Sequence, residues 1–251
     1  KDADGNRIKY YSKGDLVTTL VTGEDGKAVA KNLPLGQYRV VEVEAPYGYV
    51  LNSNEQKVTF TYVDDKTPVI KESLTFSNDR QKLAMSVTKL DAEDNTPIAG
   101  AVFGLYAGED IKNADGNVII EKGTLLEKAV SDENGMIAFV KDYPFAKYVA
   151  KEIEKPVGYV TNNEVVKFDT EYQGQKVKTA VYNSEYKNTP TTFEFTKTDI
   201  TSGAELTGAT LTVLDKDGNV IDTWTSDAKE PHIIKKLVVG ETYTLREEFA
   251  P

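Results

Sequence analysis

One pattern occurs three times in the chain and constrains its fold more than any other feature. The pattern is Tyr-x3-Glu-x3-Pro, and its first two copies continue into x-Gly-Tyr. The copies begin at Tyr38, Tyr148 and Tyr243. A motif that recurs at long intervals indicates that one structural unit is used several times. The sequence therefore predicts a tandem array of similar modules rather than one large domain.

The residues around this motif favour β-strands joined by tight turns. Runs such as residues 57–62 alternate apolar and polar side chains, which is typical of a half-buried strand. Asp-Gly pairs at Asp4-Gly5, Asp115-Gly116 and Asp217-Gly218 suit hairpin turns, because glycine tolerates positive φ. Short strands with turn signals about every 8–12 residues predict an all-β sandwich in each module.

The module boundaries follow from a second repeated feature. Lys89 and Lys197 each lie 11 residues before a Gly-Ala pair, at Gly100 and Gly208. We take these lysines to mark the first strand of a module. The predicted modules are module one at residues 1–82, which lacks its first strand, module two at 83–190, which is complete, and module three at 191–251, which is truncated at its C-terminus.

Composition excludes several classes of function. Lys and Arg number 30 and Asp and Glu number 40, and a net charge of −10 disfavours binding to nucleic acid or anionic lipid. The chain has no cysteine, so disulfides and thiolate chemistry are excluded. Its single histidine, His232, is expected in a loop or at the surface and cannot build a catalytic triad or a multi-histidine metal site. We expect no cofactor, no metal and no membrane insertion in this segment, which we interpret as part of a longer protein.

A second spacing suggests a chemical site. Glu42 and Asn78 are 36 residues apart, and so are Glu152 and Asn188. A module with both ends present would therefore hold a lysine near its first strand, a glutamate in the Tyr-x3-Glu strand and an asparagine at its last strand. In module two the lysine is Lys89. Asn183 is an alternative to Asn188, but it breaks the 36-residue spacing.

These motifs together resemble the Cna B-type domains of Gram-positive pilins and adhesins, also called SpaA-type prealbumin-like modules. The resemblance is carried by Lys89-Leu-Asp91, by Ile98-Ala-Gly100-Ala101 and by Glu-x3-Pro-x-Gly-Tyr over residues 152–159, which is the E-box of that family. It extends over essentially the whole chain. It implies tandem Ig-like β-sandwich modules arranged as a rod.

The resemblance also implies an intramolecular isopeptide bond. In module two the bond would join the Lys89 side chain to Asn188, with Glu152 as the group that shuttles protons. Burial favours a neutral, nucleophilic lysine and a protonated glutamate. A protonated glutamate can polarise the asparagine carbonyl and transfer protons as ammonia leaves. Such a step is a single turnover and does not make the protein an enzyme. The alternative is a buried Lys–Glu pair, hydrogen-bonded to asparagine, with no covalent bond.

The other two modules hold only parts of this site. Module one has Glu42 and Asn78, and its lysine is expected before residue 1, so Lys9 and Lys13 are not candidates. Module three has Lys197 and Glu247 but no acceptor.

The resemblance implies a structural role outside the cell. We expect a stalk or backbone segment of a cell-surface adhesin or pilin, anchored to the cell wall or associated with a pilus. Its expected partners are neighbouring modules of the same long chain, other pilin subunits, or host matrix protein or glycan. Two alternatives stay open: a ligand-binding adhesin module, and an accessory module of a secreted carbohydrate-active enzyme. Module two is a little longer than the other modules after Tyr106, but no insertion stands out, which favours a spacer role.

Overall fold

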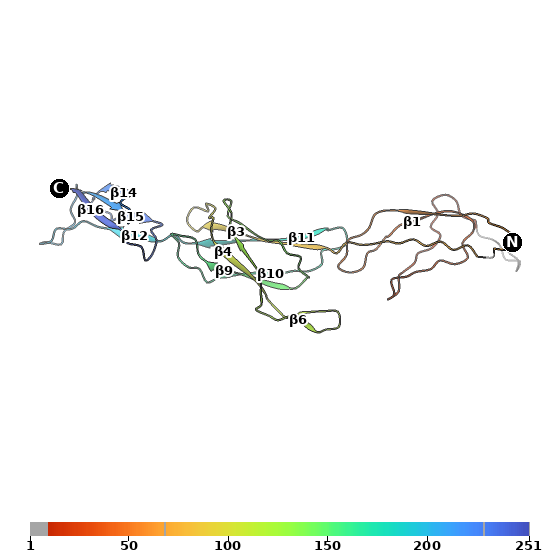
Figure 1. Cartoon of the computed structure of the whole chain (residues 1–251). Helices are drawn as coiled ribbons and strands as arrows, with labels where there is room; N and C mark the ends of the chain where they lie inside the picture. The colour runs from red at the N-terminus through yellow and green to blue at the C-terminus, as the bar shows by residue number, and fades with distance from the viewer. Residues whose placement is uncertain (1–9, 68, 228, 251) are drawn as a thin grey trace. The chain divides into compact units, whose positions relative to one another are not determined.

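A computed structural model of the chain describes residues 10–67, 69–227 and 229–250. Over these residues the regular secondary structure consists of β-strands, without a helix (Figure 1). The predicted turn at Asp4-Gly5 and the residue Lys9 lie outside the described residues. The chain divides into two compact units, Lys1–Arg80 and Gln81–Pro251. The described part contains no helix that is long and apolar enough to span a membrane.

The first unit holds one antiparallel pair of strands, β1 (Gly36–Val40) and β2 (Gln56–Phe60). Tyr38, the first residue of the repeated motif, lies opposite Val58 in this pair. Its hydroxyl donates a hydrogen bond of 2.6 Å to the carbonyl of Pro34. None of the described apolar side chains of this unit is fully buried. The packed cores formed by the described residues therefore lie in the second unit.

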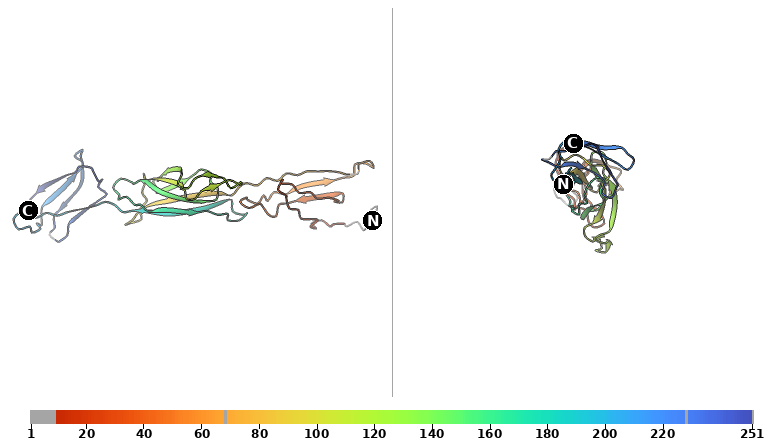
Figure 2. Two further views of the ribbon diagram at one scale, coloured as in Figure 1. Left: turned by 90° about the horizontal axis from the view of Figure 1, so that it is seen from below. Right: turned by 90° about the vertical axis from the view of Figure 1, so that its left-hand side faces the viewer.

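Module two is a sandwich of two sheets in the second unit (Figures 1 and 2). One sheet has the order β11-β3-β8, and the other has the order β10-β9-β4-β7. The strands of the first sheet are β3 (Lys82–Asp91), β8 (Met136–Phe139) and β11 (Thr179–Asn188). Those of the second are β4 (Val102–Ala107), β7 (Leu125–Val130), β9 (Lys147–Glu154) and β10 (Val165–Asp169).

The first and last strands of module two lie side by side. β3 and β11 pair in parallel over ten residues each, with Asn188 opposite Asp91, while the other pairs in the module are antiparallel. Side chains alternate between the two faces of a strand. On β3 the core face therefore carries Met85, Val87, Lys89 and Asp91, which are all buried. The same alternation that buries two apolar residues also buries two charged ones.

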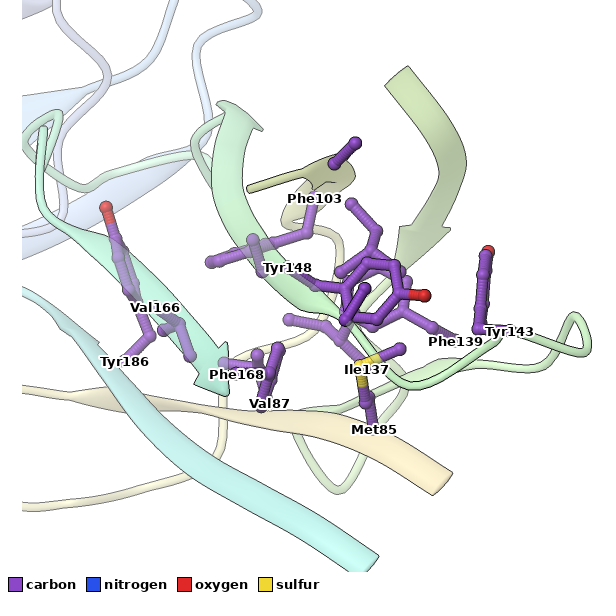
Figure 3. Packing of buried hydrophobic residues seen from close by; sticks show 14 of the residues in the cluster. Met85, Val87, Phe103, Ile137, Phe139, Tyr143, Tyr148, Val166, Phe168 and Tyr186 are labelled. Carbon is purple, nitrogen blue, oxygen red and sulfur yellow. The ribbon is translucent and has the colours of Figure 1, made fainter. Parts of the chain in front are cut away.

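Apolar side chains from both sheets fill the space between them (Figure 3). Phe103 of β4 meets Tyr186 of β11 edge to face, with ring centroids 4.9 Å apart. Tyr148 of β9 is fully buried, and its hydroxyl donates to the carbonyl of Pro144 at 2.6 Å. Each large side chain buried in this way stabilises the fold by about 1.5–3 kcal/mol. This core fixes the positions of β3, β9 and β11, the three strands that carry the candidate site.

The extra length of module two after Tyr106 forms a hairpin. Strands β5 (Ile111–Lys112) and β6 (Val118–Ile120) form it between β4 and β7, and it projects from the sandwich (Figures 1 and 2). Ile119 is 59% exposed. The additional residues of module two therefore form a hairpin with strands of two and three residues.

Module three repeats part of the strand pairing of module two. Its strands are β12 (Thr192–Phe195), β13 (Thr210–Leu214), β14 (Val220–Thr225), β15 (His232–Lys235) and β16 (Thr244–Phe249). β12 pairs with β15 as β3 pairs with β8, and β13 lies between β14 and β16 as β4 lies between β7 and β9. Trp224 lies in the core and stacks on His232 at 4.3 Å. His232 therefore lies on a strand rather than in a loop, and its side chain is 29% exposed.

Candidate functional site

Lys89 lies near the end of β3, where two neighbouring segments form hydrogen bonds with its backbone. Its amide donates to the carbonyl of Gly135 at 2.7 Å, and its carbonyl accepts from the amide of Ile98 at 3.0 Å. A Cβ atom on Gly135 would lie 2.3 Å from the Lys89 carbonyl oxygen, and Gly135 has a φ of 72°. Only glycine fits such an approach. The turn before β8 therefore packs directly against the strand that carries the lysine.

Glu152 reaches the site from the opposite sheet. It lies on β9, where the register against β4 shifts, so that Phe103 faces Glu152 while Val102 faces Glu154. A β-bulge of this kind redirects the side chains next to it. The Glu152 side chain is half-buried, and its carboxylate meets the end of β11.

Asn188 is fully buried at the end of β11. Its Nδ2 donates to Glu152 Oε2 at 3.0 Å and to the carbonyl oxygen of Val160 at 2.9 Å. Because a backbone carbonyl can only accept a hydrogen bond, the Val160 contact fixes which side of the carboxamide carries the nitrogen. The amide nitrogen therefore faces the glutamate.

Among the described residues, three buried side-chain nitrogen or oxygen atoms have no hydrogen-bond partner. They are Lys89 Nζ, Glu152 Oε1 and Asn188 Oδ1. An unsatisfied buried polar group costs about 1–3 kcal/mol, and each such group in a native protein needs an explanation. The three atoms belong to the three residues that the spacing of the sequence singled out. The folded module therefore gathers an amine, a carboxyl group and a carboxamide, each with unused bonding capacity.

The surroundings of Lys89 favour its neutral form. Burial lowers the pKa of Lys89 to about 8, although the charges of Glu152 and Asp91 act in the opposite direction. The ring of Tyr186 lies with its centroid 5.4 Å from Nζ. Burial also raises the pKa of Tyr186 to about 12, so this neighbour adds no charge near neutral pH. A substantial fraction of Lys89 is then a neutral nucleophile at mildly alkaline pH.

The alternative acceptor, Asn183, lies away from this group. Its side chain is exposed, and its Oδ1 accepts a hydrogen bond of 2.6 Å from Ser86 Oγ. Of the two asparagines on β11 considered from the sequence, only Asn188 is buried next to Glu152.

Module one contains the same glutamate–asparagine arrangement. Asn78 Nδ2 donates to Glu42 Oε2 at 2.6 Å and to the carbonyl of Val50 at 2.9 Å. The residues of these two contacts are 36 and 28 positions apart, as they are in module two. Lys13, which the alignment of the modules excludes as the lysine of this site, is exposed and lies in a turn.

Module three brings its lysine and glutamate into direct contact. Lys197 Nζ lies 3.3 Å from Glu247 Oε2, and the side chains are 28% and 36% exposed. Partly exposed ion pairs of this kind stabilise a fold by about 0–1 kcal/mol. The pair differs from module two, where the corresponding lysine is fully buried.

Asp91 and Tyr159, two further residues of the repeated motifs, contact each other at the end of module two that carries Asn188. The hydroxyl of Tyr159, the last residue of the E-box, donates to Asp91 Oδ2 at 2.9 Å, and both residues are buried. Asp91 stands in the Lys-x-Asp motif and Tyr159 ends the E-box, but no role was predicted for either residue. Their recurrence in the motifs was the only feature of the sequence that pointed to them.

Comparison with known protein families identifies the family to which these modules belong. A model of the SpaA prealbumin-like fold domain matches residues 2–73, 84–185 and 191–251. The chain belongs to this family. The prediction of tandem prealbumin-like β-sandwich modules is therefore confirmed, both by the three SpaA matches and by the all-β structure.

This chain spans less than half the length of the first two of the following relatives. The trypsin-resistant surface T6 protein of Streptococcus pyogenes serotype M6 is 25% identical over 150 residues, which is 55% of this chain and 26% of that protein. The structure of the Bacillus anthracis TIE protein matches with a TM-score of 0.58 and 27% identity, over 92% of this chain and 40% of that one. The shaft pilin spaA of Lactobacillus rhamnosus GG matches 68% of this chain and 88% of its own, with 14% identity and a TM-score of 0.32.

Proposed function

We propose that this chain is a load-bearing stalk segment of a Gram-positive cell-surface pilin or adhesin, with module two closed by an amide bond between Lys89 and Asn188. The observation that carries the proposal is the set of three unpaired buried atoms on Lys89, Glu152 and Asn188. Membership of the SpaA family and similarity to a streptococcal surface protein support an extracellular location. The partners we propose are neighbouring modules and other pilin subunits.

The proposed reaction needs no component from outside the module. Neutral Lys89 Nζ attacks Cγ of Asn188, the Nζ–Cγ bond forms, and the Cγ–Nδ2 bond breaks. Glu152 accepts a proton from Nζ and delivers one to Nδ2, with which it already shares a hydrogen bond of 3.0 Å. Nδ2 leaves as ammonia. The fold holds the reacting groups together, so proximity supplies much of the rate. The module reacts once, and it is not an enzyme.

The position of the bond suits a module under tension. Force along a row of modules would enter module two at Lys82, the start of β3, and leave at Asn188, the end of β11. These points lie at opposite ends of two parallel neighbours. A bond from Lys89 to Asn188 carries the load from one strand directly to the other. The residues between them are then removed from the path of the force.

Single-molecule stretching of the full chain tests this role. Wild-type module two should contribute almost no extension. The Lys89→Met variant should show one additional unfolding event of roughly 330 Å, because about 100 released residues extend by up to 3.3–3.6 Å each. The same additional event in the wild-type chain would refute the load-bearing role of the bond.

A further inference from the structure

The carboxylate of Asp91 is buried at the end of module two, where module three begins. It is 2% exposed. Its Oδ1 accepts from the amide of Glu93 at 2.9 Å, and its Oδ2 accepts from the Tyr159 hydroxyl at 2.9 Å. The ammonium group of Lys236 lies 3.1 Å from the same Oδ2. Lys236 belongs to module three, so the charge of a buried module-two residue is balanced from the next module.

The backbone of module three is fixed against the E-box turn that presents Tyr159. A Cβ atom on Gly158 would lie 2.6 Å from the carbonyl oxygen of Lys236. The Gly158 carbonyl accepts from the amide of Thr191 at 2.9 Å, and the Thr191 carbonyl accepts from the amide of Lys236 at 2.9 Å. The Lys236 ammonium also lies 5.3 Å from the centroid of the Tyr159 ring. Lys236 is therefore held by its backbone as well as by its charge.

Asp91 and Lys89 are two residues apart on the core face of β3, and both are buried. Lys89 faces Glu152 from β9 and Tyr186 from β11, and Asp91 is the other charge that acts on it. Asp91 in turn faces Tyr159 and Lys236, with Asp94 also within electrostatic reach. A negative charge near an amine favours its protonated form. A cation paired with Asp91 offsets that effect and leaves more of Lys89 neutral.

We propose that Lys236 is a positioning residue for the cross-link in module two: by pairing with Asp91 it makes formation of the Lys89–Asn188 bond depend on the docking of module three. This inference rests on the proposed function of the site. A module that has no docked neighbour would form the bond slowly. The cross-link would then be completed as successive modules of the stalk fold.

Asp91 and Lys236 both remain charged near neutral pH. Hydrogen bonds with Tyr159 and Asp91 raise the pKa of Lys236 well above its ordinary value. Burial raises the pKa of Asp91, but hydrogen bonds from Glu93, Lys236 and Tyr159 outweigh it and hold the pKa below its ordinary value. Removing the Lys236 charge should therefore raise the pKa of Lys89 and move the rate profile for bond formation to higher pH.

The rate of ammonia loss in the full chain tests the proposal. Chains made by pulse-labelled cell-free synthesis would be incubated at several pH values, and intact mass would be followed with time. Lys236→Gln should slow bond formation at pH 7 by about tenfold for each unit by which the pKa of Lys89 rises. Above about pH 9 the difference in rate between this variant and the wild type should become smaller. Lys235→Gln is the matched control, because Lys235 forms an exposed intermodule pair with Glu93. It should react as the wild type does.

A second substitution distinguishes an effect of charge on the rate of bond formation from an effect on folding. Adding Asp91→Asn to Lys236→Gln removes both charges and should restore the rate at pH 7. A deficit in Lys236→Gln that is the same at every pH, or no deficit relative to Lys235→Gln, would overturn the role of Lys236 while leaving the bond itself intact. A wild-type chain that never loses ammonia would instead overturn the proposed function and this inference with it.

Discussion

Replacing Lys89 with methionine should lower the free energy of unfolding of module two by about 4.7 kcal/mol, the chain-entropy value for a cross-link that closes about 100 residues. Methionine has a similar length and is compatible with the buried position of Lys89, but it offers no amine. The folded sandwich should persist, because the core side chains are unchanged. The variant loses the constraint that the bond places on the unfolded chain.

Lys82→Met is the matched control for this loss. Lys82 lies on the same strand, but its side chain is 53% exposed and pairs with Asp142 at 2.6 Å. Removing such a pair costs less than about 1 kcal/mol. Trp224 lies in module three and does not report on module two, so the measurement is amide hydrogen exchange of β3, β4 and β9 in increasing denaturant. Equal stabilities of the two variants would argue against the cross-link.

The Glu152→Gln variant should fold but fail to complete the bond on the time scale of the wild type. Glutamine has nearly the same shape and can still accept the hydrogen bond from Asn188 Nδ2. It cannot take up and release a proton as a carboxyl group does. General acid–base groups contribute about 100-fold to 10,000-fold to a rate, so bond formation should slow by at least about 100-fold. The fraction of chains that have lost ammonia after a fixed interval, measured by intact mass, gives this rate.

Glu154→Gln provides the comparison. Glu154 lies two residues further along β9 with an exposed side chain, and the substitution removes the same charge from the same strand. This variant should form the bond at the wild-type rate. A Glu152→Gln chain that links as fast as Glu154→Gln would show that Glu152 transfers no proton.

The residues of the site could be found from the sequence because they stand in motifs that repeat without gaps. The 36-residue interval from Glu152 to Asn188 includes the end of β9, all of β10 and all of β11, and the same interval recurs in module one. The spacing was enough to prefer Asn188 over Asn183, which the structure places at the surface. The all-β fold was predictable for the same reason, since alternation and Asp-Gly turns recur in each module.

Other features of the structure could not be predicted from the sequence. The hairpin of β5 and β6 uses the same Asp-Gly turn signal as hairpins elsewhere in the chain, so its projection from the sandwich was not apparent. The orientation of Asn188 depends on the Val160 carbonyl, a backbone group that any residue would supply. The pairing of Lys236 with Asp91 depends on how one module packs on the next, and Lys236 stands in none of the repeated motifs.

The accurate intact mass of the purified wild-type chain tests the central claim most directly. Only module two holds a buried lysine, the glutamate and the asparagine together within the described residues, so the proposed chemistry predicts a mass lower than that of the sequence by one ammonia. The Lys89→Met chain should have the full mass of its own sequence. A wild-type mass equal to that of the unmodified sequence would contradict the account.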